Sequence, residues 1–469
     1  MKTQDARAWA GRTFGGAELG HGARIKRAVR VAAALVVSPK ASVPKACAGS
    51  AAKRAYEFFS NAKVTHAGLL FGPVKETLAA CTGEPTILLV SDTTAPSFGG
   101  STRRKGLGPI NDSANGQGML VHTCLALAED GRVLGVLAQE VWARPTKKRS
   151  QTETTAQRRR RPRESERWPR VARTAQERLV THGVEAKVLH VADREGDIFE
   201  MFEELHALEH SFVIRGTYDR RTTTGPEDAR TYSLTEAENA PVVVCRKVEI
   251  PARHGKSART ARLMIRAARV EVLPPKNRER KGAPVWMNVV IVEELDPPSA
   301  KEALRWNLLT REPIATGEDL LRIVDCYARR WVIEDFHMGL KTGCALEQRQ
   351  LESFEALANF LAIASAIAVH ALQLRDAARA PEPRPAADVL TPIQLKLLRH
   401  ALPRLAEVCT AQQALRAVAV LGGFYDTSKK ARPGWRTLYG GMQRLLEREA
   451  GYLRALEDFR AAGHANLRE

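Results

Sequence analysis

Three acidic residues of this chain, Asp92, Asp193 and Glu334, stand in contexts that would bring their carboxylates to one cleft. Asp92 closely follows the apolar run Ile87–Val90, and Asp193 directly follows the run Val188–Ala192, so both runs are predicted to be buried strands. Open α/β sheets place their sites at strand ends. Carboxylate oxygens suit Mg²⁺, and two such ions together promote phosphodiester cleavage. The three acids therefore predict a metal-dependent phosphotransfer site.

The third acid is predicted to share the face of a helix with other functional side chains. Tyr327, Arg330, Glu334 and Lys341 are separated by 3, 4 and 7 residues, which keeps them on one stripe at about 3.6 residues per turn. We expect this stripe to face outward. The opposite, apolar side is expected to pack on the protein, and it consists of Val332, Ile333, Phe336 and Leu340. Arg330 and Tyr327 could then hold phosphates near the metal ions.

These blocks resemble the three signature blocks of bacterial cut-and-paste transposases of the Asp-Asp-Glu class, in the insertion-sequence-four family and of the transposon-five type. The blocks that carry the resemblance are Asp92-Thr93-Thr94, Asp193-Arg194-Glu195-Gly196-Asp197 and Tyr327-x2-Arg330-x3-Glu334-x6-Lys341. Further similar stretches occur in the expected order, namely Trp142-Ala143-Arg144-Pro145, Arg305-Trp306-Asn307-Leu308-Leu309-Thr310 and Leu421-Gly422-Gly423-Phe424. The resemblance spans nearly the whole chain.

The resemblance implies roles for individual residues. Asp92, Asp193 and Glu334 would hold two Mg²⁺ ions, with Mn²⁺ as a substitute, and Asp92 would bridge both. Cleavage would pass through a DNA hairpin, with Trp306 stacking on an extruded base and Arg215 contacting phosphate nearby. Burial in the core is the alternative for Trp306, and a surface salt bridge is the alternative for Arg215. Lys341 would contact the DNA backbone close to the cleavage point, although a plain surface lysine is the alternative.

The charge balance favours a nucleic-acid partner. The chain has 72 Lys and Arg against 53 Asp and Glu, a net charge of +19, which favours a polyanion through phosphate contacts. Charge alone fits DNA, RNA or an anionic surface, and the acidic blocks favour double-stranded DNA. The first 75 or so residues read as basic helices that include Arg24, Lys26 and Arg27. A solvated basic face is one interpretation, and the resemblance implies a domain that binds the element's terminal repeats.

The order of predicted elements indicates an α/β protein. Three strand-like runs between residues 84 and 144, followed by a helix and a strand, favour a ribonuclease H-like core. We expect an N-terminal helical DNA-binding domain at 1–75, a catalytic domain at 76–375 with a β-strand insertion at about 217–303, and a C-terminal helical domain at 376–469. An apolar stripe in that last domain could pair with a second copy or pack within the chain, and the resemblance favours a homodimer; the stripe is Leu438, Met442, Leu445, Leu446, Tyr452 and Leu456.

Several other classes are disfavoured. The Gly-rich loop Gly99–Gly118 has no phosphate-cradle spacing, so no nucleotide cofactor is expected. The basic segment Thr146–Arg170 reads as an exposed loop that is disordered or contacts DNA, with a nuclear-localisation signal as the alternative. Histidines have no zinc-site spacing: His122 is expected on a strand near the cleft and His337 on a helix surface.

Location in the cell is predicted from cysteine spacing and hydropathy. The seven cysteines are scattered without a CxxC pair, which indicates reduced thiols in a cytoplasm. The resemblance to bacterial transposases implies a bacterial cytoplasm, near the nucleoid. No signal peptide opens the chain, and the longest apolar stretch, Phe360–Val369, is too short to span a bilayer, so no membrane partner is expected.

Three functions remain open at the level of sequence. The leading one is an active transposase that binds its element's ends, cuts them and joins them to target DNA. A ribonuclease H-like nuclease that cuts without joining is the second. The third is a non-catalytic protein that only occupies DNA ends. All three acids and the basic N-terminal region are present, so decay of the active site is not evident.

Overall fold

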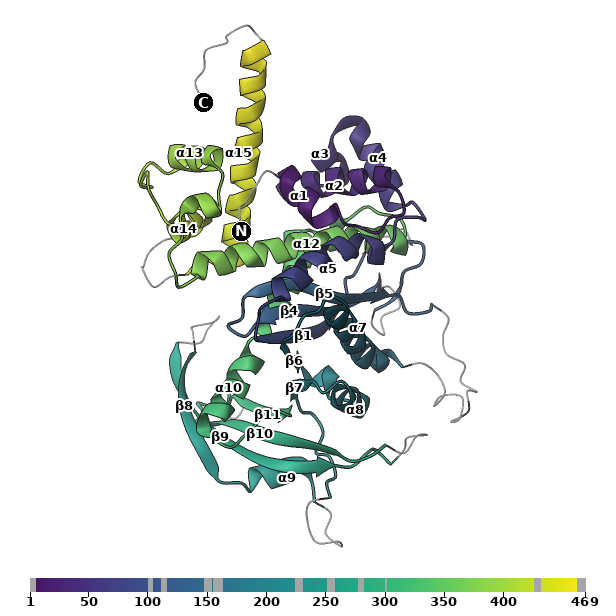
Figure 1. Cartoon of the computed structure of the whole chain (residues 1–469), viewed down its shortest axis with the longest axis vertical. Helices are drawn as coiled ribbons and strands as arrows, with labels where there is room; N and C mark the ends of the chain where they lie inside the picture. Colours follow the sequence, from purple (N-terminus) through teal and green to yellow (C-terminus); the bar gives the residue numbers. More distant parts are fainter. Residues whose placement is uncertain are drawn as a thin grey trace.

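One large mixed sheet forms the centre of the molecule (Figure 1). The computed structural model describes residues 6–99, 104–110, 116–146, 154, 163–223, 231–250, 258–276, 282–299, 302–425 and 432–461. The sheet has nine strands in the order β5-β4-β1-β6-β7-β11-β10-β9-β8. Their bounds are β1 Thr86–Thr94, β4 Leu120–Ala128, β5 Val133–Trp142, β6 Lys187–Ala192, β7 Ser211–Arg215, β8 Val242–Ile250, β9 Arg259–Val272, β10 Val285–Leu295 and β11 Arg305–Thr310.

The two halves of the sheet differ in strand direction. β1, β4 and β5 are antiparallel neighbours, whereas β1, β6 and β7 run parallel to one another. β1 is buried along nearly its whole length, which explains its continuous apolar run, because a strand covered on both faces needs no polar alternation. The parallel arrangement puts the carboxyl ends of β1 and β6 side by side.

Helices cover both faces of the sheet, and side-chain alternation divides its core in two. On β7, Phe212 and Ile214 join a cluster with Trp168 and Phe202, while Val213 between them faces the larger cluster on the other side. The helices that pack around the sheet are α5 His66–Cys81, α7 Arg167–Thr181, α8 Phe199–Ala207, α10 Gly317–Ala328, α11 Trp331–Met338 and α12 Phe354–Arg379.

The predicted strands between the second and third acids are present, and they extend the main sheet. β8, β9 and β10 pair antiparallel in sequence order, and β10 is joined to β7 through β11. The short helix α9 (Ser233–Glu238) packs on this part of the sheet. β8 alternates between exposed and partly buried positions, as a strand at the edge of a sheet does.

The helical regions at the two ends of the chain lie on the same side of the sheet, next to α12 and α5 (Figure 1). The first contains α1 Ala6–Phe14, α2 Gly22–Val37, α3 Val43–Cys47 and α4 Gly49–Phe59. The last contains α13 Pro392–Ala401, α14 Ala411–Leu421 and α15 Trp435–Ala461. Helices α5 and α12 run through residues 75 and 375, where the sequence suggested domain borders, so neighbouring regions share elements.

The apolar stripe of α15 is divided between two environments. Leu438, Met442 and Leu445 are buried in the C-terminal core against α13 and α14, so they are not available to a second copy. Tyr452 and Leu456, further along, line an open groove between α15 and α13. Within the described residues, the intramolecular alternative therefore holds for the first half of the stripe.

The apolar segment Phe360–Val369 lies inside helix α12. Among the described residues, α12 alone is long and apolar enough to cross a membrane by length and composition, and 89% of its most apolar window is buried inside the protein. Asn359 in the same helix donates hydrogen bonds to the carbonyls of Phe59 and Val64, which ties the N-terminal helices to it. The prediction of a buried helix here is confirmed.

Candidate active site at the carboxyl ends of the parallel strands

Two of the three acids lie next to each other because their strands are adjacent and parallel. Ser91 of β1 is paired with Ala192 of β6, so Asp92 and Asp193, one residue further on each strand, are neighbours. Each carboxylate accepts a hydrogen bond from the backbone that follows it: Asp92 from the Thr93 amide at 2.7 Å, and Asp193 from the Glu195 amide at 2.9 Å. The next residue of β1 and the turn after β6 thus orient the two carboxylates.

Glu334 reaches the same place from helix α11, but the predicted helix is not continuous. α10 ends at Ala328 and α11 begins at Trp331, and Gly339–Gly343 forms a π-helical turn that carries Lys341. The expectation that the whole stripe faces outward is wrong, because Tyr327 and Arg330 are only 4% and 9% exposed. A turn between two helices redirects side chains that a single helix would have kept on one face.

The Arg330 guanidinium lies between two acids. Its Nη1 is 3.2 Å from Glu334 Oε1 and 3.7 Å from Asp92 Oδ2. A buried cation in this position offsets part of the repulsion between the two carboxylates. The structure thus brings together Asp92, Arg330 and Glu334, which the sequence placed at one site.

His337 is a fourth member of the site, and its prediction as a helix-surface residue is wrong. Its side chain is 7% exposed, and its Nδ1 is 4.0 Å from Asp92 Oδ2. One ligand atom from each of Asp92, Glu334 and His337 can be chosen so that all lie within 4.8 Å of one another. The signal was available in the sequence, since His337 follows Glu334 by three residues, which is one helical turn.

The electrostatics of the site follow from burial and from crowded acids. Burial raises the pKa of Asp92 to about 7, with Asp193 and then Glu334 adding to the rise and the Thr93 amide and Arg330 opposing it. Burial also lowers the pKa of His337 to about 3, so its imidazole is neutral. A neutral imidazole beside ionisable carboxylates is the protonation state that binds metal.

The donor set fits a divalent cation. Carboxylate oxygens suit Mg²⁺ and Mn²⁺, and the neutral His337 ring also admits other transition metals. Burial is the main cause of the raised pKa of Asp92, and the Asp193 and Glu334 carboxylates add to it, so a cation bound beside Asp92 would lower that pKa. Asp193 is close enough to raise that pKa, although it is not part of the tight group formed by Asp92, Glu334 and His337.

Trp306 and Arg215 lie on neighbouring strands beside this site. β11 pairs with β7, and Arg215 Nη2 donates to the Arg305 carbonyl at 3.2 Å. Trp306 is partly buried and its ring meets the Tyr327 ring edge-on, with 5.3 Å between centroids. Tyr327 is therefore a packing partner of Trp306. Its expected contact with phosphate requires its buried ring to become accessible.

Two further residues near the acids were not singled out by the sequence. Trp331 is 57% exposed, and the Arg330 guanidinium lies 5.1 Å from its ring centroid. Asp197, in the block that begins at Asp193, is fully buried; it pairs with Arg220 at 2.6 Å and accepts from the Thr217 amide at 2.7 Å. Asp197 thus anchors the loop that follows β7.

The other predicted DNA contacts lie on the N-terminal helices and on a basic loop. Arg24, Lys26 and Arg27 are on α2, where Lys26 is exposed, the other two are partly exposed, and Arg24 donates to the Leu19 carbonyl. Most of the predicted basic loop, including residues 158–162, lies outside the described residues.

His122 is on β4, beside the site, as expected, and all seven cysteines are free thiols.

Comparison with known proteins points to the N-terminal helices. Residues 6–64, which contain α1 to α4, match a family model described as transposase DNA-binding. Among solved structures, the chain is similar to a cryo-EM structure of a piggyBac transposase synaptic complex with hairpin DNA, with 10% identity and a TM-score of 0.31 over 65% of this chain. The match covers 51% of that chain, about half of its length. The N-terminal part of this protein therefore resembles the DNA-binding region of transposases.

Proposed function

We propose that this chain is a cut-and-paste DNA transposase of the Asp-Asp-Glu class, similar to the insertion-sequence-four family and the transposon-five type. One observation carries the proposal: Asp92 lies near the carboxyl end of β1, Asp193 directly follows the parallel neighbour β6, and Glu334 comes from a helix into the same group as Asp92. The match of residues 6–64 to transposase DNA-binding regions supports DNA ends as the substrate.

The strand order supports a ribonuclease H-like core. β1, β4 and β5 form an antiparallel meander, and β6 and β7 then continue parallel to β1 in the order β5-β4-β1-β6-β7. This is the arrangement predicted from three consecutive strands followed by helix and strand. The strands β8 to β10 would then be an insertion between the second and third acids.

In the proposed reaction, the residues of the site hold DNA and metal in one place. Asp92, Asp193 and Glu334 would hold Mg²⁺ or Mn²⁺, which would activate an attacking oxygen and stabilise a leaving one. Arg330, now between two carboxylates, would be free to contact a phosphate once those charges are neutralised otherwise. Lys341, in the π-helical turn, and Arg215, at the end of β7, would contact the DNA backbone on either side.

The proposed sequence of steps needs a single active site for each DNA end. Hydrolysis of one strand leaves a 3′ hydroxyl, which attacks the opposite strand and closes a hairpin while the flanking DNA leaves. Hydrolysis of the hairpin restores the 3′ hydroxyl, which then attacks target DNA. Trp306 would stack on a base extruded by the hairpin bend, because an indole face offers about 1–3 kcal/mol of stacking.

We also propose that the active form is a homodimer on DNA in the bacterial cytoplasm, near the nucleoid. Joining two ends to one target requires two sites held together. Since Leu438, Met442 and Leu445 are buried within the chain, any pairing through α15 would use its distal half, around Tyr452 and Leu456.

The test uses the inverted repeats that flank the gene as substrate. The purified chain with Mg²⁺ should excise a DNA fragment bounded by these repeats and join it to a plasmid, and Asp193→Ala should bind the ends but leave them uncut. Cleavage without joined products would favour the nuclease alternative. End binding without any cleavage would favour the non-catalytic regulator, and undiminished cleavage by Asp193→Ala would reject the site.

The hairpin step has a separate test. Trp306→Ala should slow hairpin formation more than the first nick, whereas Trp286→Ala, which removes a 45% exposed indole on β10, should change neither step. Denaturing gels resolve nicked, hairpin and open ends. Equal slowing of nicking and hairpin formation by Trp306→Ala would reject the stacking role.

A further inference from the structure

Arg167 is a buried cation that lies beside the candidate active site and has no role in the mechanism above. It is the first residue of α7, and its side chain is 10% exposed. Its guanidinium lies 5.6 Å from the Trp142 ring centroid and 5.9 Å from that of Trp168. Two indoles that flank a guanidinium hold it in one orientation while leaving its N–H groups free to bond in its plane.

Each nitrogen of that guanidinium has its own partner. Nε donates to Thr93 Oγ1 at 3.1 Å, Nη2 donates to Glu195 Oε2 at 2.5 Å, and Nη1 donates to the Glu164 carbonyl at 2.8 Å. Thr93 directly follows Asp92, and Glu195 lies two residues after Asp193. One side chain therefore joins the end of β1, which carries Asp92, to the turn that follows β6 and begins at Asp193.

The end of β1 and the turn after β6 also orient the carboxylates. The amide of Thr93 donates to Asp92 Oδ1, and the amide of Glu195 donates to Asp193 Oδ1. On the other side, Thr93 Oγ1 is 2.9 Å from His122 Nδ1, and the His122 ring packs edge-on against Trp168 at 4.5 Å between centroids. A continuous set of contacts thus connects Arg167 to both acids.

We propose that Arg167 is a positioning residue that fixes the separation of the Asp92 and Asp193 carboxylates and thereby sets the affinity of the site for divalent cations. This inference rests on the proposed function. Two neighbouring carboxylates repel each other, so without a link the turn after β6 would be free to move away from the end of β1 in the absence of a cation. The planar guanidinium joins these two segments and would hold the two carboxylates at a fixed separation.

The proposed role requires the planar, forked shape of the Arg167 guanidinium as well as its positive charge. A lysine would keep the positive charge of residue 167, but its single ammonium lacks the planar geometry that reaches Thr93 and Glu195 together. Arg167→Lys and Arg167→Met should therefore weaken cation binding to a similar degree. A role through charge alone would make the lysine variant behave like the wild type.

The first experiment measures Mn²⁺ binding to the DNA-free full chain by titration calorimetry. Arg167→Met and Arg167→Lys should raise the Kd for Mn²⁺ by about tenfold or more, and Thr93→Val and Glu195→Gln by a smaller factor. Arg173→Met is the matched control, because Arg173 lies on the same helix and makes a similar bond of 2.5 Å to Glu204, away from the acids. Wild-type Mn²⁺ affinity in Arg167→Met would overturn the proposal.

Two further measurements separate positioning from folding. If Arg167→Met fails to fold, Thr93→Val and Glu195→Gln decide the question, and an unchanged Kd in both would overturn the proposal. In folded variants, adding Thr93→Val to Arg167→Met should change the Kd little further, because both changes break the same hydrogen bond between Arg167 and Thr93. Additive effects would contradict a shared link.

Cleavage assays distinguish this inference from the proposed function. The Mg²⁺ concentration for half-maximal cleavage should rise about tenfold in Arg167→Met, with the rate recovering at saturating Mg²⁺ and with DNA-end binding unchanged. A lower rate that saturating Mg²⁺ does not restore would contradict the positioning role. If the wild type binds Mn²⁺ and Arg167→Met does not, yet neither cuts DNA, the positioning role stands and the proposed function fails.

Discussion

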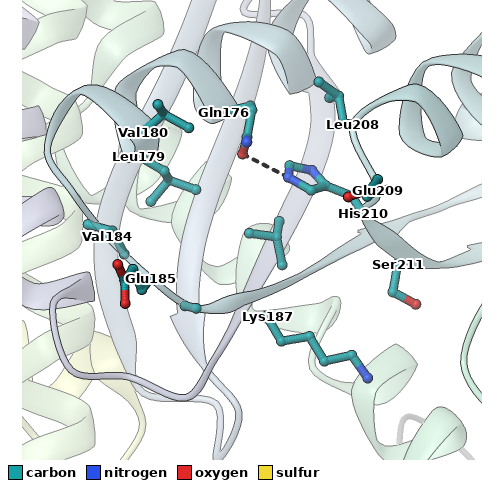
Figure 2. A pocket seen from close by; sticks show the side chains of 12 residues that line it. Gln176, Leu179, Val180, Val184, Glu185, Lys187, Leu208, Glu209, His210 and Ser211 are labelled. Carbon is teal, nitrogen blue, oxygen red and sulfur yellow. Dashed lines mark hydrogen bonds between the residues drawn. The ribbon is translucent and has the colours of Figure 1, made fainter.

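The two ends of the parallel strands β6 and β7 differ in how their charged and polar side chains are paired. At the amino end, where β6 begins with Lys187 and β7 with Ser211, charged groups pair with one another: the buried Glu312 accepts from Lys187 Nζ at 2.7 Å and from Arg322. His210 bonds to His190 at 3.0 Å and to Gln176 at 2.8 Å beside a hollow of about 310 Å³ (Figure 2).

At the carboxyl end the charges are not balanced. The buried Arg330 lies between Asp92 and Glu334, and the pKa of Asp92 still rises to about 7 because of burial and of its acidic neighbours Asp193 and Glu334. At the amino end, ion pairs lower the pKa of Glu312 despite its burial. The contrast indicates that the amino end serves stability, whereas the carboxyl end keeps a deficit of positive charge that a cation would fill.

The largest effect should come from removing one acid from the crowded end. Asp92→Asn should reduce cleavage by more than about 10³-fold while raising the stability of the metal-free protein by about 1–4 kcal/mol at pH 8. The sign follows from the raised pKa: the folded protein holds the Asp92 proton more tightly than the unfolded chain, so its stability falls as pH rises from about 4 to about 7.

Denaturant unfolding in EDTA at pH 5 and pH 8 measures this difference. The stabilising effect of Asp92→Asn should be larger at pH 8 than at pH 5. If Asp92→Asn is less stable than the wild type at pH 8, the Asp92 charge does not destabilise the fold, and the proposed difference between the two ends is wrong.

At the paired end the opposite outcome is expected. Glu312→Gln leaves the cations of Lys187 and Arg322 without their shared carboxylate and should destabilise the protein by about 2–4 kcal/mol. Cleavage per folded molecule should be unchanged. The control is Asp296→Asn, which breaks an exposed pair with Arg262 and should cost less than about 1 kcal/mol. Loss of cleavage in fully folded Glu312→Gln would show that the amino end also serves catalysis.

Sequence reasoning found the acids because strand ends leave a local signature. An apolar run followed within two residues by a carboxylate indicates both the strand and the end of the sheet at which the acid lies, as for Asp92 and Asp193. The same reasoning failed where the local pattern continued but the chain turned. Tyr327 fits a helical stripe, yet the break after Ala328 buries its ring against Trp306.

Other features depend on contacts between distant segments. Arg167 meets Thr93 and Glu195 only after the sheet forms, and Glu312 meets Lys187 across 125 positions of sequence. No local spacing marks such residues. His337 is an intermediate case, because its spacing from Glu334 was visible but its burial was not.

Mg²⁺ should stabilise the protein through the carboxyl end alone. Since a ligand that binds only the folded state stabilises it by about 2.7 kcal/mol at a concentration one hundred times its Kd, saturating Mg²⁺ should raise the melting temperature of the wild type and of Glu312→Gln. EDTA should reverse the rise. Asp92→Asn should show little or no response, and a full response in that variant would place the cation elsewhere.

The smallest expected effect concerns the histidine pair at the amino end. Burial lowers the pKa of His190 and lowers that of His210 to about 4, with His190 also affected by His210 and His210 also by Arg311. The two histidines therefore bind protons more readily in the unfolded chain than in the folded one. The free energy of unfolding should fall as pH drops from about 6.5 towards 4. His210→Gln keeps a hydrogen-bonding side chain between His190 and Gln176 and removes one titrating group.

Between pH 7 and pH 5 the wild type should lose about 1–2 kcal/mol more stability than His210→Gln. Chemical denaturation in EDTA at the two pH values gives the difference directly. Equal losses would mean that His210 accepts a proton in the folded protein. The amino end would then contain a group that changes charge with pH in the folded state, as Asp92 does at the carboxyl end. The difference between the two ends depends on that outcome. A neutral histidine pair joined by a hydrogen bond stabilises the fold, whereas the acids at the carboxyl end are arranged to bind a cation.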